Sequence, residues 1–264
     1  MLFEIEMFKL PNFLNNMNNR KLGIIIQARV GSIRLPNKIN LPFYRNNTIL
    51  DIIIKKLLQL NNSIPIVLST GDNKENNILK NYSDKYNIEF FQGNEINVLD
   101  RFIRTSEAFS FTHVIRVCSD NPFLNLNFIN QLIDLYEVRD YDYYSYKDNF
   151  NVPAIRTHLG LFVEIVSLSS LKVEEENEKN INIIEHVTKY VYENPQKFKI
   201  YLKKIPDFLN KDLRFTIDDQ DDFDNLRKVY VFYAESDLEK TIEYIEEKEE
   251  IKNKMLANVK KYTK

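Results

Sequence analysis

The sequence predicts an α/β fold of the Rossmann-like type, with a mostly parallel sheet and helices on both faces. Short β-branched runs alternate with helical patterns from Lys21 to Tyr141. Alternation of this kind produces parallel strands joined by crossover helices. The chain has 264 residues and 44% hydrophobic content, which is enough to build one large domain with a full core.

In the first half of the chain, residues 21–140, each predicted strand is followed by a helix. Thr48 is an N-cap residue for its helix, and Asp72 with Glu75 three residues later has the spacing of a capping box. Apolar runs predict the strands, and apolar positions at helical spacing predict the helices. The expected elements are strand 22–27, helix 48–60, strand 65–69, a helix opened by Asp72, strand 88–91, helix 98–109, strand 113–118 and helix 125–136.

After Tyr141 the alternation changes, and we expect a second part at residues 141–235, followed by a C-terminal helix at 236–264. The charges of that last helix are interpreted as a solvated face. Residues 1–20 end in an Asn-rich run and are expected to be a flexible lead-in to the domain at 21–264. The elements expected here are strands 142–146, 161–167, 199–203 and 213–217, and helices 181–193, 221–234 and 237–261.

Composition excludes several classes of protein. The net charge of -2 comes from 36 basic and 38 acidic residues, so nothing global favours binding to nucleic acid or to an anionic membrane. Cys118 is the only cysteine, which excludes an internal disulfide and a multi-cysteine metal site and suits a reducing cytoplasm. The N-terminus has charges within its apolar stretch, so we expect a cytoplasmic protein without membrane insertion.

The loop after the first strand is the strongest local signal for a ligand site. Arg29, Arg34 and Lys38 surround Gly31 and Ser32 at the carboxyl end of a strand, where open α/β sheets bind ligands. A glycine lets backbone N–H groups turn toward an anion, and three cations would neutralise a triphosphate. The spacing is neither that of a Walker A loop nor that of a dinucleotide fingerprint. A surface loop with scattered basic residues would show the same features, so these residues alone leave both interpretations open.

Residues 22–38 closely resemble the signature of the spore-coat polysaccharide biosynthesis protein F family, relatives of CMP-Kdo and CMP-sialic acid (acylneuraminate) synthetases. Segments 98–101, 116–122, 185–188 and 214–218 are similar to later motifs of the family, in the same order. The resemblance implies a magnesium-dependent cytidylyltransferase that uses CTP. It also implies a fold of the nucleotide-diphospho-sugar transferase type, with a small strand-containing insertion for acceptor binding and dimerisation.

The resemblance also implies roles for single residues. Arg29, Arg34 and Lys38 are expected to face the phosphates, with Arg29 and Lys38 among the catalytic residues. The full set expected to bind the nucleotide is Gln27, Ala28, Arg29, Gly31, Ser32, Arg34, Lys38, Ser69, Thr70 and Arg116. The set expected to bind the acceptor is Arg156, Glu164, Glu185 and His186, of which the last two fall in the expected helix 181–193.

Asp120 and Asp218 are the expected Mg²⁺ ligands and the remaining catalytic residues. Each lies just past an expected strand, and Mg²⁺ prefers one or two carboxylates together with phosphate oxygens. Either aspartate by itself is better interpreted as an N-cap of the next helix. Their places in the family motifs put them beside the basic loop that follows the first strand, and this favours metal binding over helix capping. Asp219, Asp221 and Asp222 are expected to favour the N-terminus of the next helix.

We therefore expect an enzyme that transfers CMP from CTP to an acidic or phosphorylated sugar-like acceptor and releases pyrophosphate, for surface polysaccharide or glycoconjugate biosynthesis. A nucleotide-sugar-dependent glycosyltransferase is the first alternative. It releases no pyrophosphate from a triphosphate, so it would not need the three cations Arg29, Arg34 and Lys38. A noncatalytic nucleotide-binding protein is the second alternative, and it would not need the two metal-binding aspartates.

Two departures from the family pattern bear on these expectations. Asn37 replaces a usual glycine, and Phe162 replaces a usual acidic residue. We expect Phe162 to change the acceptor pocket, so the identity of the acceptor does not follow from the resemblance. Related synthetases often pair through the corresponding half of the chain, so we expect a homodimer formed through residues 141–203.

Overall fold

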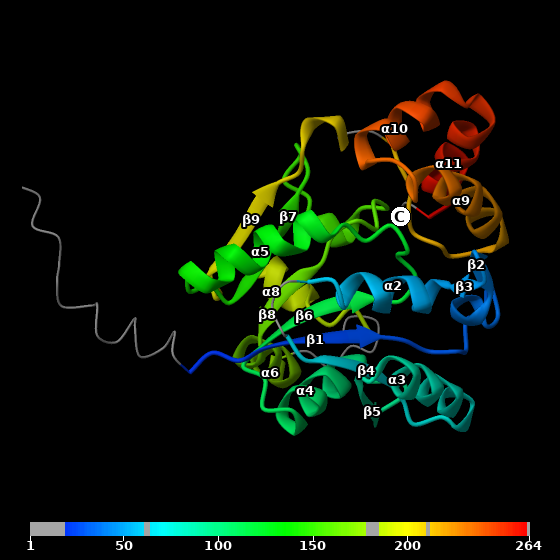
Figure 1. Ribbon diagram of the computed structural model, residues 1–264. Coiled ribbons are helices and arrows are strands. Elements are labelled where there is room, and N and C mark those ends of the chain that lie inside the picture. Colours follow the sequence, from blue (N-terminus) through cyan, green and yellow to red (C-terminus); the bar gives the residue numbers. More distant parts are fainter. Residues whose placement is uncertain (1–18, 61–63, 178–184, 210–211, 263–264) are drawn as a thin grey trace, which may run out of the picture.

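The computed structural model describes residues 19–60, 64–177, 185–209 and 212–262. Within these residues a seven-stranded sheet has the order β5-β4-β1-β6-β8-β7-β9. Helices α2 and α5 lie on one side of the sheet and α4 and α6 on the other, while α9, α10 and α11 gather beyond the carboxyl end of β1 (Figure 1). The expected Rossmann-like α/β fold is confirmed.

The elements follow the chain in an order close to the expected one. The strands of the large sheet are β1 (Leu22–Gln27), β4 (Ile66–Gly71), β5 (Glu89–Gly93), β6 (His113–Cys118), β7 (Tyr143–Lys147), β8 (Glu164–Ser167) and β9 (Ile200–Lys204). A separate hairpin consists of β2 (Pro42–Tyr44) and β3 (Asn47–Thr48). The α-helices are α2 (Ile49–Leu57), α3 (Lys80–Tyr86), α4 (Val98–Ala108), α5 (Leu126–Val138), α6 (Leu168–Asn177), α8 (Lys189–Glu193), α9 (Gln220–Tyr233), α10 (Leu238–Glu247) and α11 (Glu249–Tyr262). The short 3₁₀ helices are η1 (Lys38–Asn40), η2 (Lys74–Leu79), η3 (Ala154–Arg156) and η4 (Asp207–Leu209).

The sheet brings the carboxyl ends of most strands to one edge. β1 pairs in parallel with β4 and β6, and β4 pairs in parallel with β5. β8 is antiparallel to both β6 and β7, and β7 pairs in parallel with β9. The loops that follow β1, β4, β6 and β7 therefore leave the sheet on the same side, where open α/β sheets bind ligands.

The core explains why the first strand is an uninterrupted apolar run. Ile24 and Ile26 belong to the apolar cluster that includes α2, α5 and α9, whereas Ile25 belongs to the cluster that includes α4 and α6. Because successive side chains point to opposite faces of a strand, a strand covered on both faces needs apolar residues at every position. Thr48 caps α2 through a capping box with Asp51, as the sequence predicted for the cap.

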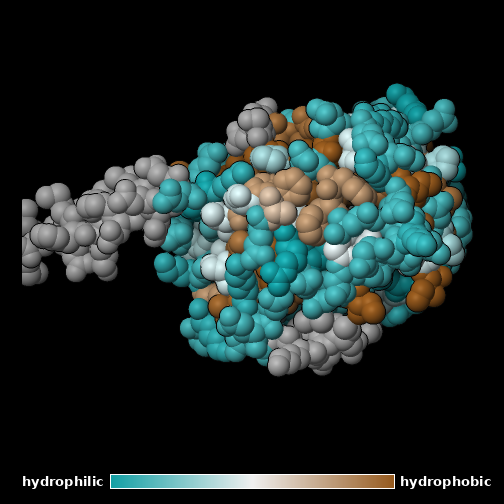
Figure 2. Space-filling view, turned by 90° about the horizontal axis from the view of Figure 1, so that it is seen from below, coloured by the Kyte–Doolittle hydropathy of each residue, from teal (hydrophilic) through white to brown (hydrophobic). Residues whose placement is uncertain are grey.

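Figure 2 shows the molecule from the side where α3, α4 and α6 lie. This side is largely hydrophilic, with a band of hydrophobic side chains across its middle. In the part of the chain that the structure describes, no helix is long and apolar enough to span a membrane. The expected pairing of two copies through residues 141–203 stays a prediction, as do the domain boundaries. The expected flexible lead-in falls almost wholly outside the described residues.

The expected strand at 213–217 is wrong. The segment is extended and buried, but its backbone bonds go to loops: Phe215 N donates to His158 O at 2.9 Å, and Ile217 N donates to Asp120 O at 3.1 Å. A sequence pattern shows that a segment is buried, not which backbone groups pair with it. Asp218 therefore follows an extended loop segment instead of a strand.

Two expected helices also differ. The helix expected at 237–261 is two helices, because Lys248 leaves the helical conformation with φ -104° and ψ 85°. In the described part of 181–193, the helix begins only at Lys189, because Val187 has a left-handed φ of 58°. Glu185 and His186 consequently lie in a turn before α8.

The expected capping box at Asp72 and the full strand at 161–167 are wrong as well. Asn73 occupies the N-cap position of η2 without a side-chain cap. A 3₁₀ helix forms there instead of the first turn of an α-helix, and α3 follows it. The strand forms only from Glu164, because Gly160 before it has a left-handed φ of 56° and the next residues run through a loop.

We predict that Gly23→Ala destabilises the fold. A Cβ at Gly23 would lie 2.2 Å from ring carbon Cε2 of Phe111, so the ring or the central strand must move, and overpacking of this kind costs about 1–3 kcal/mol. Urea denaturation measures the free energy of unfolding. Gly31→Ala is the matched control, because a Cβ there meets no atom within 4 Å. Wild-type stability of Gly23→Ala would contradict this packing.

Candidate active site

The loop after β1, residues 28–38, is named the phosphate loop, and hydrogen bonds of Asn76 hold its first residues in place. Val30 N donates to Asn76 Oδ1 at 3.0 Å. The buried Asn76 side chain also donates to Gly71 O at 3.2 Å and to Glu95 Oε2 at 2.7 Å. The amide thereby joins the phosphate loop to the end of β4 and to the segment before α4. Sequence patterns gave no signal for Asn76, because its partners are distant or backbone groups.

The middle of the phosphate loop is mostly exposed, except at Leu35, which is buried in the core. Gly31 and Arg34 are exposed and Ser32 is half-buried. Asn37 then takes a left-handed conformation with φ 58°, which asparagine tolerates better than most residues, so it can stand where the family pattern has glycine. The turn directs Lys38 inward, and its side chain is only 12% exposed.

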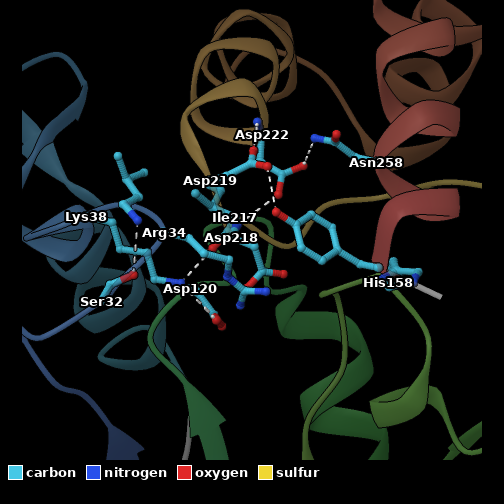
Figure 3. Close-up of polar contacts among 12 residues, drawn as sticks. Ser32, Arg34, Lys38, Asp120, His158, Ile217, Asp218, Asp219, Asp222 and Asn258 are labelled. Carbon is cyan, nitrogen blue, oxygen red and sulfur yellow. Dashed lines mark hydrogen bonds and ion pairs between the residues drawn. The ribbon is translucent and has the colours of Figure 1, made fainter. Parts of the chain in front are cut away.

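Each of the two expected metal-binding aspartates is paired with a cation of the phosphate loop (Figure 3). Lys38 Nζ lies 3.3 Å from Asp120 Oδ2 and donates to Ile217 O at 2.7 Å. Arg34 Nη2 donates to Asp218 Oδ1 at 2.5 Å. The structure thus brings four expected site residues into one group, Arg34, Lys38, Asp120 and Asp218, which is named the ion-pair cluster.

Neither aspartate of the ion-pair cluster acts as a helix cap. The N-cap of α5 is Asn125, which accepts from the N–H groups of Asn127 and Phe128. The N-cap of α9 is Asp219, which accepts from Asp222 N, as expected for the role of Asp219. The side chains of Asp120 and Asp218 are 27% and 18% exposed, so both carboxylates can be reached from solvent.

The two carboxylates fit Mg²⁺ better than a metal held by protein ligands alone. Ile217 N donates to Asp120 O, so the backbones that carry the two aspartates lie side by side. Among the described residues, no group of three or more His, Cys, Asp or Glu side chains could hold a metal ion. Mg²⁺ is usually bound by one or two carboxylates together with substrate phosphates and water, and Asp120 and Asp218 are two carboxylates of this kind.

A buried arginine fixes Asp218 from the other side. The Arg214 side chain is 1% exposed. Its Nη2 lies 2.6 Å from Asp218 Oδ2 and 2.7 Å from Asp222 Oδ2, and its Nε donates to Asp222 Oδ1 at 2.8 Å. Its Nη1 lies 2.7 Å from His158 Nδ1, and burial and the charge of Arg214 lower the pKa of His158, which keeps Nδ1 an acceptor. The sequence placed Arg214 in a family motif but gave it no role.

Arg116 and Glu164 were expected at the nucleotide and at the acceptor, and the structure pairs them with each other. Arg116 Nη1 donates to Glu164 Oε2 at 2.8 Å, and both side chains are buried. Gln27 Oε1 accepts from Arg116 Nε and Nη2, at 3.4 Å each. Arg116 therefore orients the Gln27 amide at the carboxyl end of β1.

Tyr143 and Thr188 complete this buried group; sequence reasoning missed Tyr143, and it placed Thr188 in a family motif without giving it a role. The Tyr143 hydroxyl donates to Glu164 Oε1, and Thr188 Oγ1 donates to the same oxygen at 3.0 Å. Burial and the charge of Glu164 raise the pKa of Tyr143 well above its ordinary value, so its hydroxyl remains a donor. Glu164 therefore holds β6, β7 and the turn before α8 together, in addition to any role toward an acceptor.

The other residues expected at the acceptor lie on two segments. Arg29 Nη2 lies 3.3 Å from Glu185 Oε1, and both side chains are about half exposed, so the phosphate loop meets the turn that also carries His186. Arg156 lies exposed in η3. The structure joins Glu185 to the phosphate loop and leaves Arg156 on a separate segment.

Ser69 and Thr70, expected at the base and ribose, have fully buried side chains at the end of β4. Ser69 Oγ bonds to Thr105 Oγ1 at 3.0 Å, whereas Thr70 Oγ1 has no hydrogen-bond partner among the described residues. Ala28, also in the expected nucleotide set, donates its backbone N–H to Ser69 O at 3.2 Å. Buried polar atoms in native proteins are nearly always paired with protein or water. Of the Ser69 and Thr70 hydroxyls, that of Thr70 is therefore the one that can accept a further partner.

Phe162 lies in the core instead of facing an acceptor. Its ring stacks on Phe128 with centroids 4.8 Å apart and lies 4.6 Å from the ring of Tyr146. The aromatic residue at this position therefore fills space between β7 and α5. The usual acidic residue of the family pattern would have no counter-charge in this aromatic cluster.

Comparison with known proteins identifies the family. Residues 23–260 match the model of the family described as Cytidylyltransferase. The chain is 28% identical over 212 residues to the spore coat polysaccharide biosynthesis protein SpsF of Bacillus subtilis, which covers 78% of this chain and 85% of that protein.

Solved structures of known proteins are similar to this chain in fold. The fold is similar to that of a cytidylyltransferase from Leptospira borgpetersenii, with a TM-score of 0.76, 26% identity, and coverage of 88% of this chain and 96% of the other. It is also similar to CMP:2-keto-3-deoxy-manno-octonic acid synthetase complexed with CTP, with a TM-score of 0.60, 11% identity, and coverage of 80% and 99%. Because the family model spans residues 23–260, the protein belongs to the cytidylyltransferase family and is a nucleotidyltransferase.

Proposed function

We propose that the protein transfers CMP from CTP to an acidic or phosphorylated sugar-like acceptor and releases pyrophosphate, in the cytoplasm, for surface polysaccharide or glycoconjugate biosynthesis. The ion-pair cluster carries the proposal, because it sets cations suited to a triphosphate against carboxylates suited to Mg²⁺. Similarity to a polysaccharide biosynthesis protein supports the pathway class. Similarity in fold to a synthetase complexed with CTP supports the donor.

The side chains of the phosphate loop bind the triphosphate. Arg34 is 54% exposed, and it turns from Asp218 toward the phosphates when the nucleotide arrives. Lys38 is held more deeply between Asp120 and Ile217 O, so it contributes its charge with little movement. Asp120 and Asp218 would hold Mg²⁺, which would neutralise charge on the α-phosphate when bound.

The reaction needs positioning and charge more than covalent chemistry. An acceptor oxygen forms a bond to the α-phosphorus in line with the bond that breaks, and pyrophosphate leaves with the bridging oxygen. Arg29, Arg34 and Lys38 bind the pyrophosphate, whose charge grows as it leaves. No covalent intermediate with the enzyme is required.

The acceptor lies beside the turn that carries Glu185 and His186. Arg29 is paired with Glu185, so this turn borders the phosphate loop, and exposed Arg156 is a cation suited to an anionic acceptor. Family membership favours transfer of a nucleotidyl group over transfer of a glycosyl group, the alternative that the sequence left open.

Pyrophosphate release tests the proposal. Each of the four nucleoside triphosphates is combined with Mg²⁺ and a panel of acidic, phosphorylated and neutral sugars. We expect release with CTP and one or more anionic sugars, because the cations of the site face both substrates. Preference for another triphosphate would contradict the CTP assignment, and preference for a neutral sugar would contradict the acceptor class.

The metal assignment predicts the effect of Asp120→Asn and Asp218→Asn. Each change keeps the side-chain shape but removes a charged ligand, so we expect turnover to fall by about two orders of magnitude or more. The melting temperature should change little in Asp120→Asn, whereas it should fall in Asp218→Asn, which also removes a charged partner of the buried Arg214. Asp221→Asn is the matched control, since Asp221 is exposed in the first turn of α9. A Mg²⁺ titration of pyrophosphate release measures the effect. Wild-type rates in both variants would refute the assignment.

Arg34→Ala is expected to weaken binding of CTP far more than binding of CMP, because its partners are the β- and γ-phosphates. Loss of one charge-assisted contact predicts a decrease in CTP affinity of about tenfold. Isothermal titration calorimetry with both nucleotides measures the difference. Arg45→Ala is the matched control, because Arg45 is also an exposed arginine paired with a carboxylate, that of Glu235. Equal losses for CTP and CMP would show that Arg34 does not meet the terminal phosphates.

A further inference from the structure

The last helix of the described chain reaches the active site. In α11, Asn258 Nδ2 donates to Asp222 Oδ1 at 2.7 Å, and Figure 3 shows Asn258 pointing toward Asp222. Lys261 Nζ and the Tyr262 hydroxyl donate to the same oxygen of Asp219, at 2.7 and 2.6 Å. Although burial opposes it, these two hydrogen bonds lower the pKa of Asp219 to about 2. The end of α11 is therefore anchored to the N-terminus of α9, directly after Asp218.

This anchorage places an aromatic ring against two guanidinium groups. The centroid of the Tyr262 ring lies 4.9 Å from Cζ of Arg34 and 4.6 Å from Cζ of Arg214. Both arginines bind the carboxylate of Asp218. Arg214 is buried and held by several further bonds, whereas Arg34 is exposed on an open loop, so the ring has the larger effect on Arg34.

We propose that Tyr262 is a positioning residue for the nucleotide: its ring holds the guanidinium of Arg34 over the active site, ready to meet the terminal phosphates of the triphosphate. A long arginine side chain on an exposed loop loses conformational freedom when it binds an anion. A ring that already limits this freedom reduces the loss, and the cation–π contact remains available when Arg34 turns from Asp218 to a phosphate. The inference rests on the proposed triphosphate site.

A purely structural role for Tyr262 makes a different prediction. As an anchor of α11, it would act through its hydroxyl on Asp219, and its loss would lower stability and weaken all nucleotides alike. As a positioning residue, it acts through its ring on Arg34, and its loss weakens only ligands that carry the β- and γ-phosphates. The hydroxyl and the ring can be removed separately, so the two roles can be distinguished.

The test compares Tyr262→Phe, which keeps the ring, with Tyr262→Leu and Tyr262→Gln, which remove it. Calorimetry gives the Kd for CTP and for CMP, and thermal unfolding checks the fold. We expect Tyr262→Leu and Tyr262→Gln to weaken CTP about three- to tenfold, the range of a cation–π contact, with the Kd for CMP unchanged. Tyr262→Phe should bind CTP like the wild type. Tyr244→Leu in α10 is the matched control, because Tyr244 also lies beside a cation, that of Lys248.

A double-mutant cycle with Arg34→Ala identifies the partner. If the ring acts through Arg34, Tyr262→Leu adds no further loss of CTP affinity when Arg34 is already alanine. Additive losses, or equal losses in Tyr262→Phe and Tyr262→Leu, would overturn the positioning role while the triphosphate site stands. A wild-type protein that binds CTP no more tightly than CMP would overturn the proposed triphosphate site, and the role of Tyr262 with it.

Discussion

The buried guanidinium of Arg214 is the constraint on which the active-site half of the structure depends. A buried charge without partners costs several kcal/mol, so Asp218 and Asp222 must stay beside it. The planar, forked geometry of the guanidinium then fixes where both carboxylates point. Asp218 in turn holds Arg34, and Asp222 holds Asn258 of α11. One cation thus places the proposed metal ligand, a phosphate-loop arginine and the C-terminal helix.

The two ion pairs of the ion-pair cluster differ in how easily they can be exchanged. The pair of Arg34 with Asp218 includes a side chain that is half exposed, and such pairs contribute at most about 1 kcal/mol. A triphosphate with several negative charges can therefore displace the carboxylate. Lys38 is mostly buried and also bonds to Ile217 O, so it is tied to the backbone as well as to Asp120. The same group thus combines an exposed cation with a mostly buried one.

The errors of the sequence-based fold occur where the local sequence does not specify the backbone conformation or its hydrogen-bond partners. The strand expected at 213–217 and the strand 161–167 were both predicted from buried apolar runs, but a run shows burial without showing which backbone groups pair. The break at Lys248 within the expected helix 237–261 has no proline or glycine to mark it. Val187, which is β-branched, takes a left-handed φ that its residue type disfavours, so the start of α8 had no local signal.

Local sequence patterns were enough to predict the features that depend on neighbouring residues: the alternation of strands and helices, the buried first strand, the Thr48 cap and the basic loop that carries the family signature. Which distant residues meet depends on the folded chain. Arg34 and Asp218 are 184 positions apart, and no periodicity or propensity links them, since both act over a few residues along the chain. Their meeting follows from the order of strands in the sheet and from the buried charge of Arg214, which exist only once the whole chain has folded.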